Sequence, residues 1–186
     1  MRRTALIFLA CQQACFLGGL AVCIALRPEG LGANAGVSYY GNFFDTFPFY
    51  ALSMLGTALF SLLAARVITV PAYWPLRQGL LAIAFLTAVI TLTPYTRSAF
   101  VDLSHTLAGI IMFTIQLAIS VWALVKLNWS AGALTFVLLE TATGIVSVMF
   151  VLPAEGYLIQ AQIGFQVAFA GLLFFAFKGL LPREGE

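Results

Sequence analysis

Apolar residues fill six stretches of the chain, and most charged residues lie outside these stretches. The stretches lack the alternation of apolar and polar positions that marks a membrane barrel strand. All but one reach the roughly 20 residues with which a helix crosses about 30 Å of hydrocarbon. The pattern predicts an all-α fold, an integral membrane bundle of six transmembrane helices in one domain over residues 1–186. The predicted spans are residues 4–26, 47–68, 75–92, 103–127, 131–152 and 157–177.

The stretch 75–92 is the shortest, and prolines bracket it at Pro71, Pro75 and Pro94. Proline is favoured in the first turn of a helix and interrupts a helix elsewhere. We therefore expect this helix either to stand more upright than the others or to be broken.

The composition supports lipid rather than water as the solvent. Of all residues 62% are hydrophobic and 9% are charged, and the mean hydropathy is +1.01. A soluble domain carries roughly 25% charged residues, so this chain has too little charge to cover a globule in water. We expect the lipid bilayer to be its main partner, and the net charge of +2 does not indicate nucleic acid as a partner.

The basic residues predict the orientation of the helices. Only Arg27 and Arg97 fall on one side of the predicted membrane. The other side holds Arg2, Arg3, Arg66, Arg77, Lys126, Lys178 and Arg183. Loops rich in Lys and Arg stay in the cytoplasm. The count predicts a multi-pass protein of the cell membrane with both termini cytoplasmic (N-in and C-in).

The residues that bind common cofactors are missing or badly spaced. The chain has one histidine, which excludes a bis-histidine haem, and its cysteines, Cys11, Cys15 and Cys23, all fall in the first stretch at spacings unlike those of zinc or redox motifs. The sequence has no Walker loop and no dinucleotide fingerprint. We therefore predict no cofactor, no metal and no catalytic residue.

The predicted loop 27–46 outside the membrane is long and divided into two halves. Its first half is rich in glycine, and its second half, with the start of the next stretch, is rich in aromatic residues. Aromatic side chains often form a belt where the membrane meets water. Long loops also serve as lids over binding sites. The pattern leaves both interpretations open.

Polar side chains inside the predicted spans are the most informative feature, because burying them in lipid is costly. Glu140 is the only acidic residue well inside a span, and it lies near the middle of residues 131–152. Gln116 and Gln166 lie near the middle of their own spans, and Gln12 and Gln13 lie in the first span. These groups should converge, either as a hydrogen-bonded network between helices or as the wall of a cavity.

From this convergence we predict a small or lipid-like ligand in an outward-facing polar cavity under the aromatic loop. The predicted ligand-binding residues are Tyr39, Asn42, Asp45, Arg97, Asp102, His105, Gln116, Glu140, Gln162 and Gln166. Two other functions stay open. The protein could be a substrate-capture or structural subunit of a larger membrane transport assembly. It could also be a lipid-acting hydrolase that uses Asp102, His105 and Glu140, although no nucleophile is evident.

Small residues form a stripe along the last span, nearly opposite Gln162 and Gln166. Its members are Ala161, Gly164, Ala168 and Gly171. Such stripes let two helices pack closely in a membrane. We expect the stripe to hold a neighbouring helix of the same chain, or to be the contact of a homodimer or another membrane partner.

The first loop also carries a family resemblance. Arg27-Pro28, Gly36-Val37-Ser38-Tyr39-Tyr40-Gly41, Thr46, Pro48 and Tyr50 resemble the first outer loop of a domain-of-unknown-function family of six-helix bacterial membrane proteins. That family is distantly similar to the DRAM-like and FRAG-like membrane proteins. The resemblance implies a part in lipid handling. The helix count and the long first loop also resemble the substrate-capture subunits of energy-coupling-factor vitamin importers.

Overall fold

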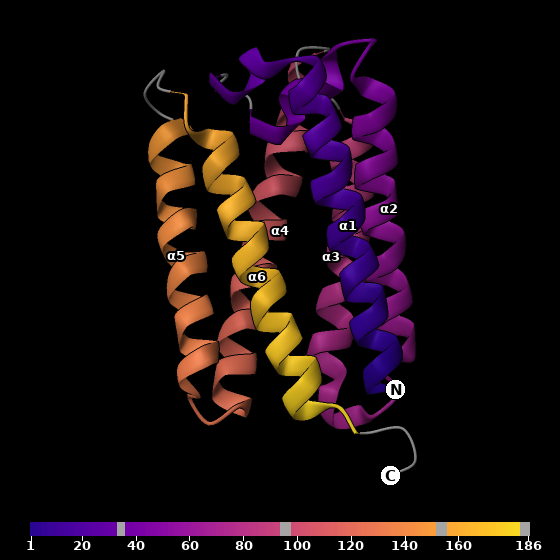
Figure 1. The fold of residues 1–186 in the computed structure, drawn as a ribbon, viewed down its shortest axis with the longest axis vertical. Helices are drawn as coiled ribbons and strands as arrows, with labels where there is room; N and C mark the ends of the chain where they lie inside the picture. The colour runs from indigo at the N-terminus through magenta and orange to yellow at the C-terminus, as the bar shows by residue number, and fades with distance from the viewer. Residues whose placement is uncertain (33–35, 94–97, 152–155, 183–186) are drawn as a thin grey trace.

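The computed structural model describes residues 1–32, 36–93, 98–151 and 156–182. Over these ranges the chain is helical and has no strand, and six of its helices are long and apolar enough to cross a membrane. The fold is therefore compatible with an integral membrane protein, as predicted (Figure 1). The long helices are α1 (Arg2–Leu26), α2 (Phe47–Val67), α3 (Trp74–Leu92), α4 (Ala99–Lys126), α5 (Ala131–Val151) and α6 (Leu158–Leu180).

Most predicted spans agree with these helices to within two residues, and α4 is the main exception. It begins at Ala99, four residues before the predicted start. The hydroxyl of Ser98 accepts a hydrogen bond from the backbone N–H of Val101 at 3.2 Å, which caps the helix. Asp102 then lies in the first turn, where the helix dipole favours a negative charge. Asp102 is therefore a residue of α4, and the helix does not begin after it.

Pro71 and Pro75 do not break the third stretch, and Pro94 lies outside the described residues. Pro71–Tyr73 forms a short 3-10 helix, η3, and α3 follows it directly as one continuous helix from Trp74. Pro75 lies at the start of α3, where its missing N–H costs no hydrogen bond.

The helices form two groups joined through α6. Helices α1, α2 and α3 pack side by side, α4 follows α3, and α5 pairs with α6. Helix α6 also contacts α1 and α4 and so links the two groups (Figure 1). The start of α1 and the end of α6 lie at the same end of the bundle, which we call the terminal end. The opposite end carries the long loop, and we call it the loop end.

The hydrophobic core is centred on α6. Its side chains Phe169, Leu172, Leu173 and Phe177 are fully buried. The small-residue stripe of this helix packs against α5, because a Cβ atom added at Gly164 would meet Thr143 and one added at Gly171 would overlap with Phe136. Of the two uses predicted for the stripe, the structure shows the contact with a helix of the same chain.

The loop between α1 and α2 folds over the loop end as two short 3-10 helices, η1 (Pro28–Gly32) and η2 (Gly36–Asn42). Its aromatic residues differ in how far they are buried. Tyr40 is fully buried and its backbone carbonyl accepts a hydrogen bond from Thr46 at 2.7 Å, whereas the side chain of Phe44 is 97% exposed. The aromatic half of the loop is therefore packed against the bundle at Tyr40 and exposed at Phe44.

Candidate functional site

The only histidine of the chain joins the loop to the bundle. His105 is buried near the start of α4, and its Nδ1 lies 2.6 Å from the carbonyl oxygen of Thr93. Its Nε2 lies 2.8 Å from the hydroxyl oxygen of Ser38 in η2. A carbonyl oxygen can only accept, so Nδ1 carries the proton. The Nε2 of the neutral ring then accepts the hydrogen bond from Ser38.

Gln162 holds the same loop from α6. Its Oε1 accepts a hydrogen bond of 2.8 Å from the backbone N–H of Val37. Gly36 precedes this contact with a φ of +61°, a conformation that costs other residues more than it costs glycine. A Cβ atom at Gly36 would also overlap with the Gln162 amide. Gln162 therefore holds the loop in place. It does not line the central cavity together with Gln166.

A charged cluster lies on the exposed side of the loop. The Nε of Arg27 donates to both carboxylate oxygens of Asp45, at 2.9 and 3.0 Å, and its Nη1 donates to Glu29 at 3.3 Å. The guanidinium group also lies 4.0 Å from the centre of the Phe43 ring. The hydrogen bond from Arg27 holds the pKa of the Asp45 carboxyl below its ordinary value. Asp45 is thus paired at the surface and does not point into the bundle.

The buried amides of the central region meet in two pairs. The Nε2 of Gln116 donates to the Oε1 of Gln166 at 3.1 Å, and the Nε2 of Gln12 donates to the hydroxyl of Ser61 at 2.8 Å. A cavity of about 30 Å³ lies between the pairs, enough for a water molecule. Its wall is formed by Gln12, Phe16, Met54, Thr57, Ile83, Thr87, Met112, Gln116 and Gln166.

The Gln116–Gln166 hydrogen bond gives a stability prediction. We expect Gln116→Leu to lower the free energy of unfolding by about 0.6–2 kcal/mol, because it leaves the Gln166 amide without its partner inside the bundle. The double variant Gln116→Leu/Gln166→Leu removes both partners and should recover part of this loss. Denaturant titration in detergent measures both values. The single variant Gln166→Leu is measured beside them, and a double variant whose loss equals the sum of the two single losses would contradict the pairing.

Glu140 does not join the amides. Its side chain is 0% exposed, and neither of its carboxyl oxygens has a hydrogen-bond partner. The hydroxyl of Ser120, from α4, lies beside the carboxyl group without completing a hydrogen bond and is also fully buried. A buried polar group without a partner costs roughly 1–3 kcal/mol, so this pair is costly to the fold.

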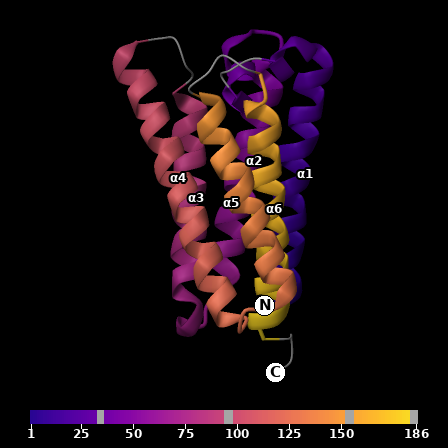
Figure 2. The ribbon, with the colours of Figure 1, turned by 90° about the vertical axis from the view of Figure 1, so that its left-hand side faces the viewer.

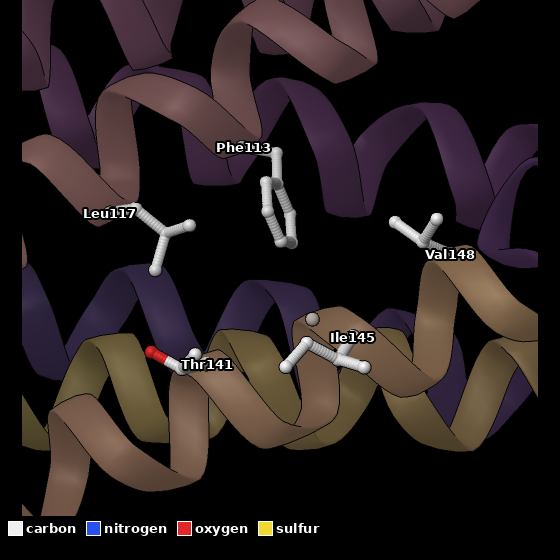
Figure 3. A pocket seen from close by; sticks show the side chains of 6 residues that line it. Phe113, Leu117, Thr141, Ile145 and Val148 are labelled. Carbon is white, nitrogen blue, oxygen red and sulfur yellow. The ribbon is translucent and has the colours of Figure 1, made fainter.

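A groove opens beside this pair between α4 and α5. The two helices lie close together at the terminal end and separate toward the loop end (Figure 2). The groove has a volume of about 250 Å³, and its wall consists of Phe113, Leu117, Thr141, Gly144, Ile145 and Val148. Figure 3 shows its α4 side chains facing those of α5 across the gap.

Chain direction places the polar pair on the terminal side of the groove wall. Helix α4 runs toward the terminal end and α5 runs away from it. Ser120 follows Leu117 by about one turn, and Glu140 immediately precedes Thr141. Both therefore lie on the terminal side of the residues that form the groove wall, and neither is itself part of that wall.

The other predicted site residues do not form one cavity with Glu140. Tyr39 is half-buried and contacts the rings of Tyr40 and Phe43, and Asn42 is exposed. Asp102 is half-buried in the first turn of α4. Arg97 lies outside the described residues.

Sequence reasoning missed several polar residues of these clusters. Ser38 stands in the segment that carries the family resemblance and Ser120 lies on the polar face of the span 103–127, but the sequence did not show that they lie beside His105 and Glu140. Tyr50 belongs to the aromatic segment and to the family resemblance, and neither feature predicted its place beside Ser38. Across the four described ranges no group of three or more His, Cys, Asp or Glu side chains could hold a metal ion.

Comparisons of the chain with protein-family models, with curated proteins and with solved structures find no match. The resemblance of the first loop to a six-helix membrane family therefore stays a prediction, and the function is argued from the site alone.

Proposed function

We propose that this protein binds a lipid-like molecule that enters from the bilayer between α4 and α5. The observation that carries the proposal is the buried, unpartnered pair of Glu140 and Ser120, whose near neighbours in sequence, Thr141 and Leu117, belong to the wall of an apolar groove. A membrane protein that keeps a carboxyl group without a partner needs a reason beyond packing, because nothing in hydrocarbon can satisfy the group.

The chemistry of the groove limits the ligand. Its walls are almost entirely apolar, and exposed side chains such as Leu138 and Val121 continue the surface that faces the acyl chains. The volume of about 250 Å³ is smaller than the roughly 300–1,000 Å³ of pockets that enclose a drug-sized molecule. The groove therefore suits one acyl chain or one ring system. A hydroxyl or amine group on that molecule would donate to Glu140 and satisfy it.

This proposal changes the entrance that the sequence suggested. The polar cavity was expected under the loop, but neither the central cavity nor the groove has a loop residue in its wall. Among the predicted ligand-binding residues, Glu140 stays in the proposed site. The Gln116–Gln166 pair belongs to the wall of the central cavity, and His105 and Gln162 act on the loop.

The orientation is part of the same proposal. We place the terminal end in the cytoplasm of a cell, because Arg66 and Arg77 flank the turn between α2 and α3, and Lys126 and Lys178 end α4 and α6. Positive residues at one end of the spans favour retention of that end inside. The loop end then faces outward.

Native mass spectrometry of the purified protein tests the proposal. We expect the wild type to carry a co-purified lipid-like molecule and Glu140→Met to lose it, because methionine fills a similar volume without an acceptor. Leu117→Trp should also lose it by filling the groove. Val167→Trp is the matched control, since it adds the same bulk to a lipid-facing position on α6.

The outcomes separate the functions. A molecule that is bound by the wild type and the control but not by the other two variants would support the proposal. A protein that carries no molecule in any variant would contradict it and would favour a subunit of a larger transport assembly. Co-purification of further subunits in the same spectra would identify that assembly directly.

A further inference from the structure

The hydroxyl of Ser38 differs in its partner from the hydroxyls of three serines in the long helices. Ser61, Ser104 and Ser147 each donate to the carbonyl oxygen four residues earlier in their own helix. This local bond satisfies a hydroxyl within a membrane helix at no cost to tertiary structure. Ser38 instead lies 2.8 Å from the Nε2 of His105, 67 residues away in the chain.

The two contacts of His105 orient its ring so that Nε2 can act as a base toward Ser38. Because its Nδ1 must donate to the carbonyl of Thr93, the unprotonated nitrogen of the neutral ring is the one that faces Ser38. A hydroxyl that donates to a ring nitrogen, with the ring oriented by a third group, is the arrangement of an activated serine nucleophile. Here a backbone carbonyl takes the place of the usual carboxylate.

A hydrogen-bond donor without an acceptor lies at the same place. Tyr50, in the first turn of α2, is 2% exposed, and its hydroxyl has no hydrogen-bond partner. This hydroxyl lies close to that of Ser38, but the two are not in hydrogen-bonding geometry. A buried donor beside a nucleophile can stabilise the oxyanion that forms when the nucleophile attacks a carbonyl group. The unpaired hydroxyl of Tyr50 therefore points to a ligand independently of the Ser38–His105 contact.

We propose that Ser38, His105 and Tyr50 form a site that hydrolyses an acyl ester. The Oγ of Ser38 bonds to the ester carbonyl carbon while its proton passes to Nε2 of His105. The resulting oxyanion accepts a hydrogen bond from Tyr50. The bond to the alcohol oxygen then breaks, and that oxygen takes the proton from Nε2.

Water completes the cycle. It attacks the acyl group on Ser38 and gives one proton to His105, the carboxylic acid leaves, and the proton returns to Ser38. The net reaction converts one ester and one water molecule to one acid and one alcohol. No other co-reactant is required.

The position of the site selects a membrane lipid ester as the substrate class. His105 lies six residues into α4, roughly 9 Å from the start of the helix. This depth corresponds to the boundary between the hydrocarbon and the polar headgroups, where the ester bonds of glycerolipids lie. Ser38 itself is half-buried at the loop end, so its hydroxyl is not sealed in the core.

Covalent labelling tests this site independently of the α4–α5 groove. The protein in detergent micelles is treated with an alkyl fluorophosphonate, and the labelled peptide is located by mass spectrometry. We expect an adduct on Ser38 that is absent in Ser38→Ala and forms at least about 100-fold more slowly in His105→Gln, since loss of a general base costs about 10²–10⁴-fold. Ser104→Ala is the matched control and should leave the adduct unchanged.

The variant Tyr50→Phe tests the site without disturbing the fold. This change removes a hydroxyl that bonds to nothing, so the thermal unfolding temperature should not fall. Labelling of Ser38 should slow by about 10²-fold if the hydroxyl stabilises the oxyanion. No adduct on Ser38, or equal labelling rates in the wild type and in His105→Gln, would overturn the proposal. Such a failure would leave the ligand in the groove unaffected.

Discussion

Glu140→Met is expected to raise the free energy of unfolding by about 1–3 kcal/mol, while it removes binding in the proposed groove. The gain arises because the variant removes a carboxyl group that is fully buried and has no hydrogen-bond partner. Methionine and glutamate have similar helix propensities, and an unbranched apolar side chain of similar size adapts to the same space. Few substitutions at a buried site raise stability, so the sign of this change is informative.

Thermal unfolding in detergent, with the lipid removed, measures the effect. Glu140→Gln is the matched control, because its amide keeps two polar atoms in the same place and should bring no comparable gain. A fall in stability for Glu140→Met would mean that the carboxyl group has a structural partner, and the argument for a ligand at this position would be lost. Separate measurement of binding and unfolding shows whether the residue serves function at the expense of the fold.

Gly36→Ala is expected to release the loop from the loop end of the bundle. The left-handed backbone conformation at this position costs a residue with a Cβ atom about 1–2 kcal/mol. The new Cβ atom would also displace the Gln162 amide and weaken the bond to Val37, which contributes roughly 0.5–1.5 kcal/mol. We therefore expect the free energy of unfolding to fall by about 2–3 kcal/mol.

Gly32→Ala is the control for this change, because a Cβ atom at Gly32 meets no other atom and its φ is not in the left-handed region. Limited proteolysis should cut the loop of Gly36→Ala faster than that of the wild type or of Gly32→Ala. Equal cleavage rates in all three proteins would show that the Gly36 contact does not hold the loop. Since Ser38 follows two residues later, slower labelling of Ser38 should accompany the faster cleavage.

The membrane helices are the part of the structure that could be predicted well from sequence. An apolar run must hydrogen-bond its own backbone in lipid, so length and composition alone indicate where a helix lies. The start of α4 was the largest error, because the cap is made by the small hydroxyl of Ser98 and the apolar pattern begins only later. The residues that position the loop were harder to identify, since Ser38 contacts a helix that follows it by more than sixty residues.

The depth of each polar group within its helix could also be read from the chain. The sequence places Gln116, Glu140 and Gln166 near the middle of their spans. It does not show which of them form hydrogen bonds with each other. Gln116 and Gln166 pair with each other, and Glu140 faces Ser120 instead. A helix of 3.6 residues per turn shows which side chains share a face but does not show which helix that face meets.

The sequence by itself determined which segments are helices and the depth of their polar residues, because these follow from interactions between residues close in sequence. The packing of α4 against α5 and α6 is what leaves Glu140 without a partner and opens the groove beside it. The fold of the loop is what brings Ser38 to His105 and Tyr50. Both sites depend on contacts between distant segments, whose geometry is set by how all the side chains fill space together.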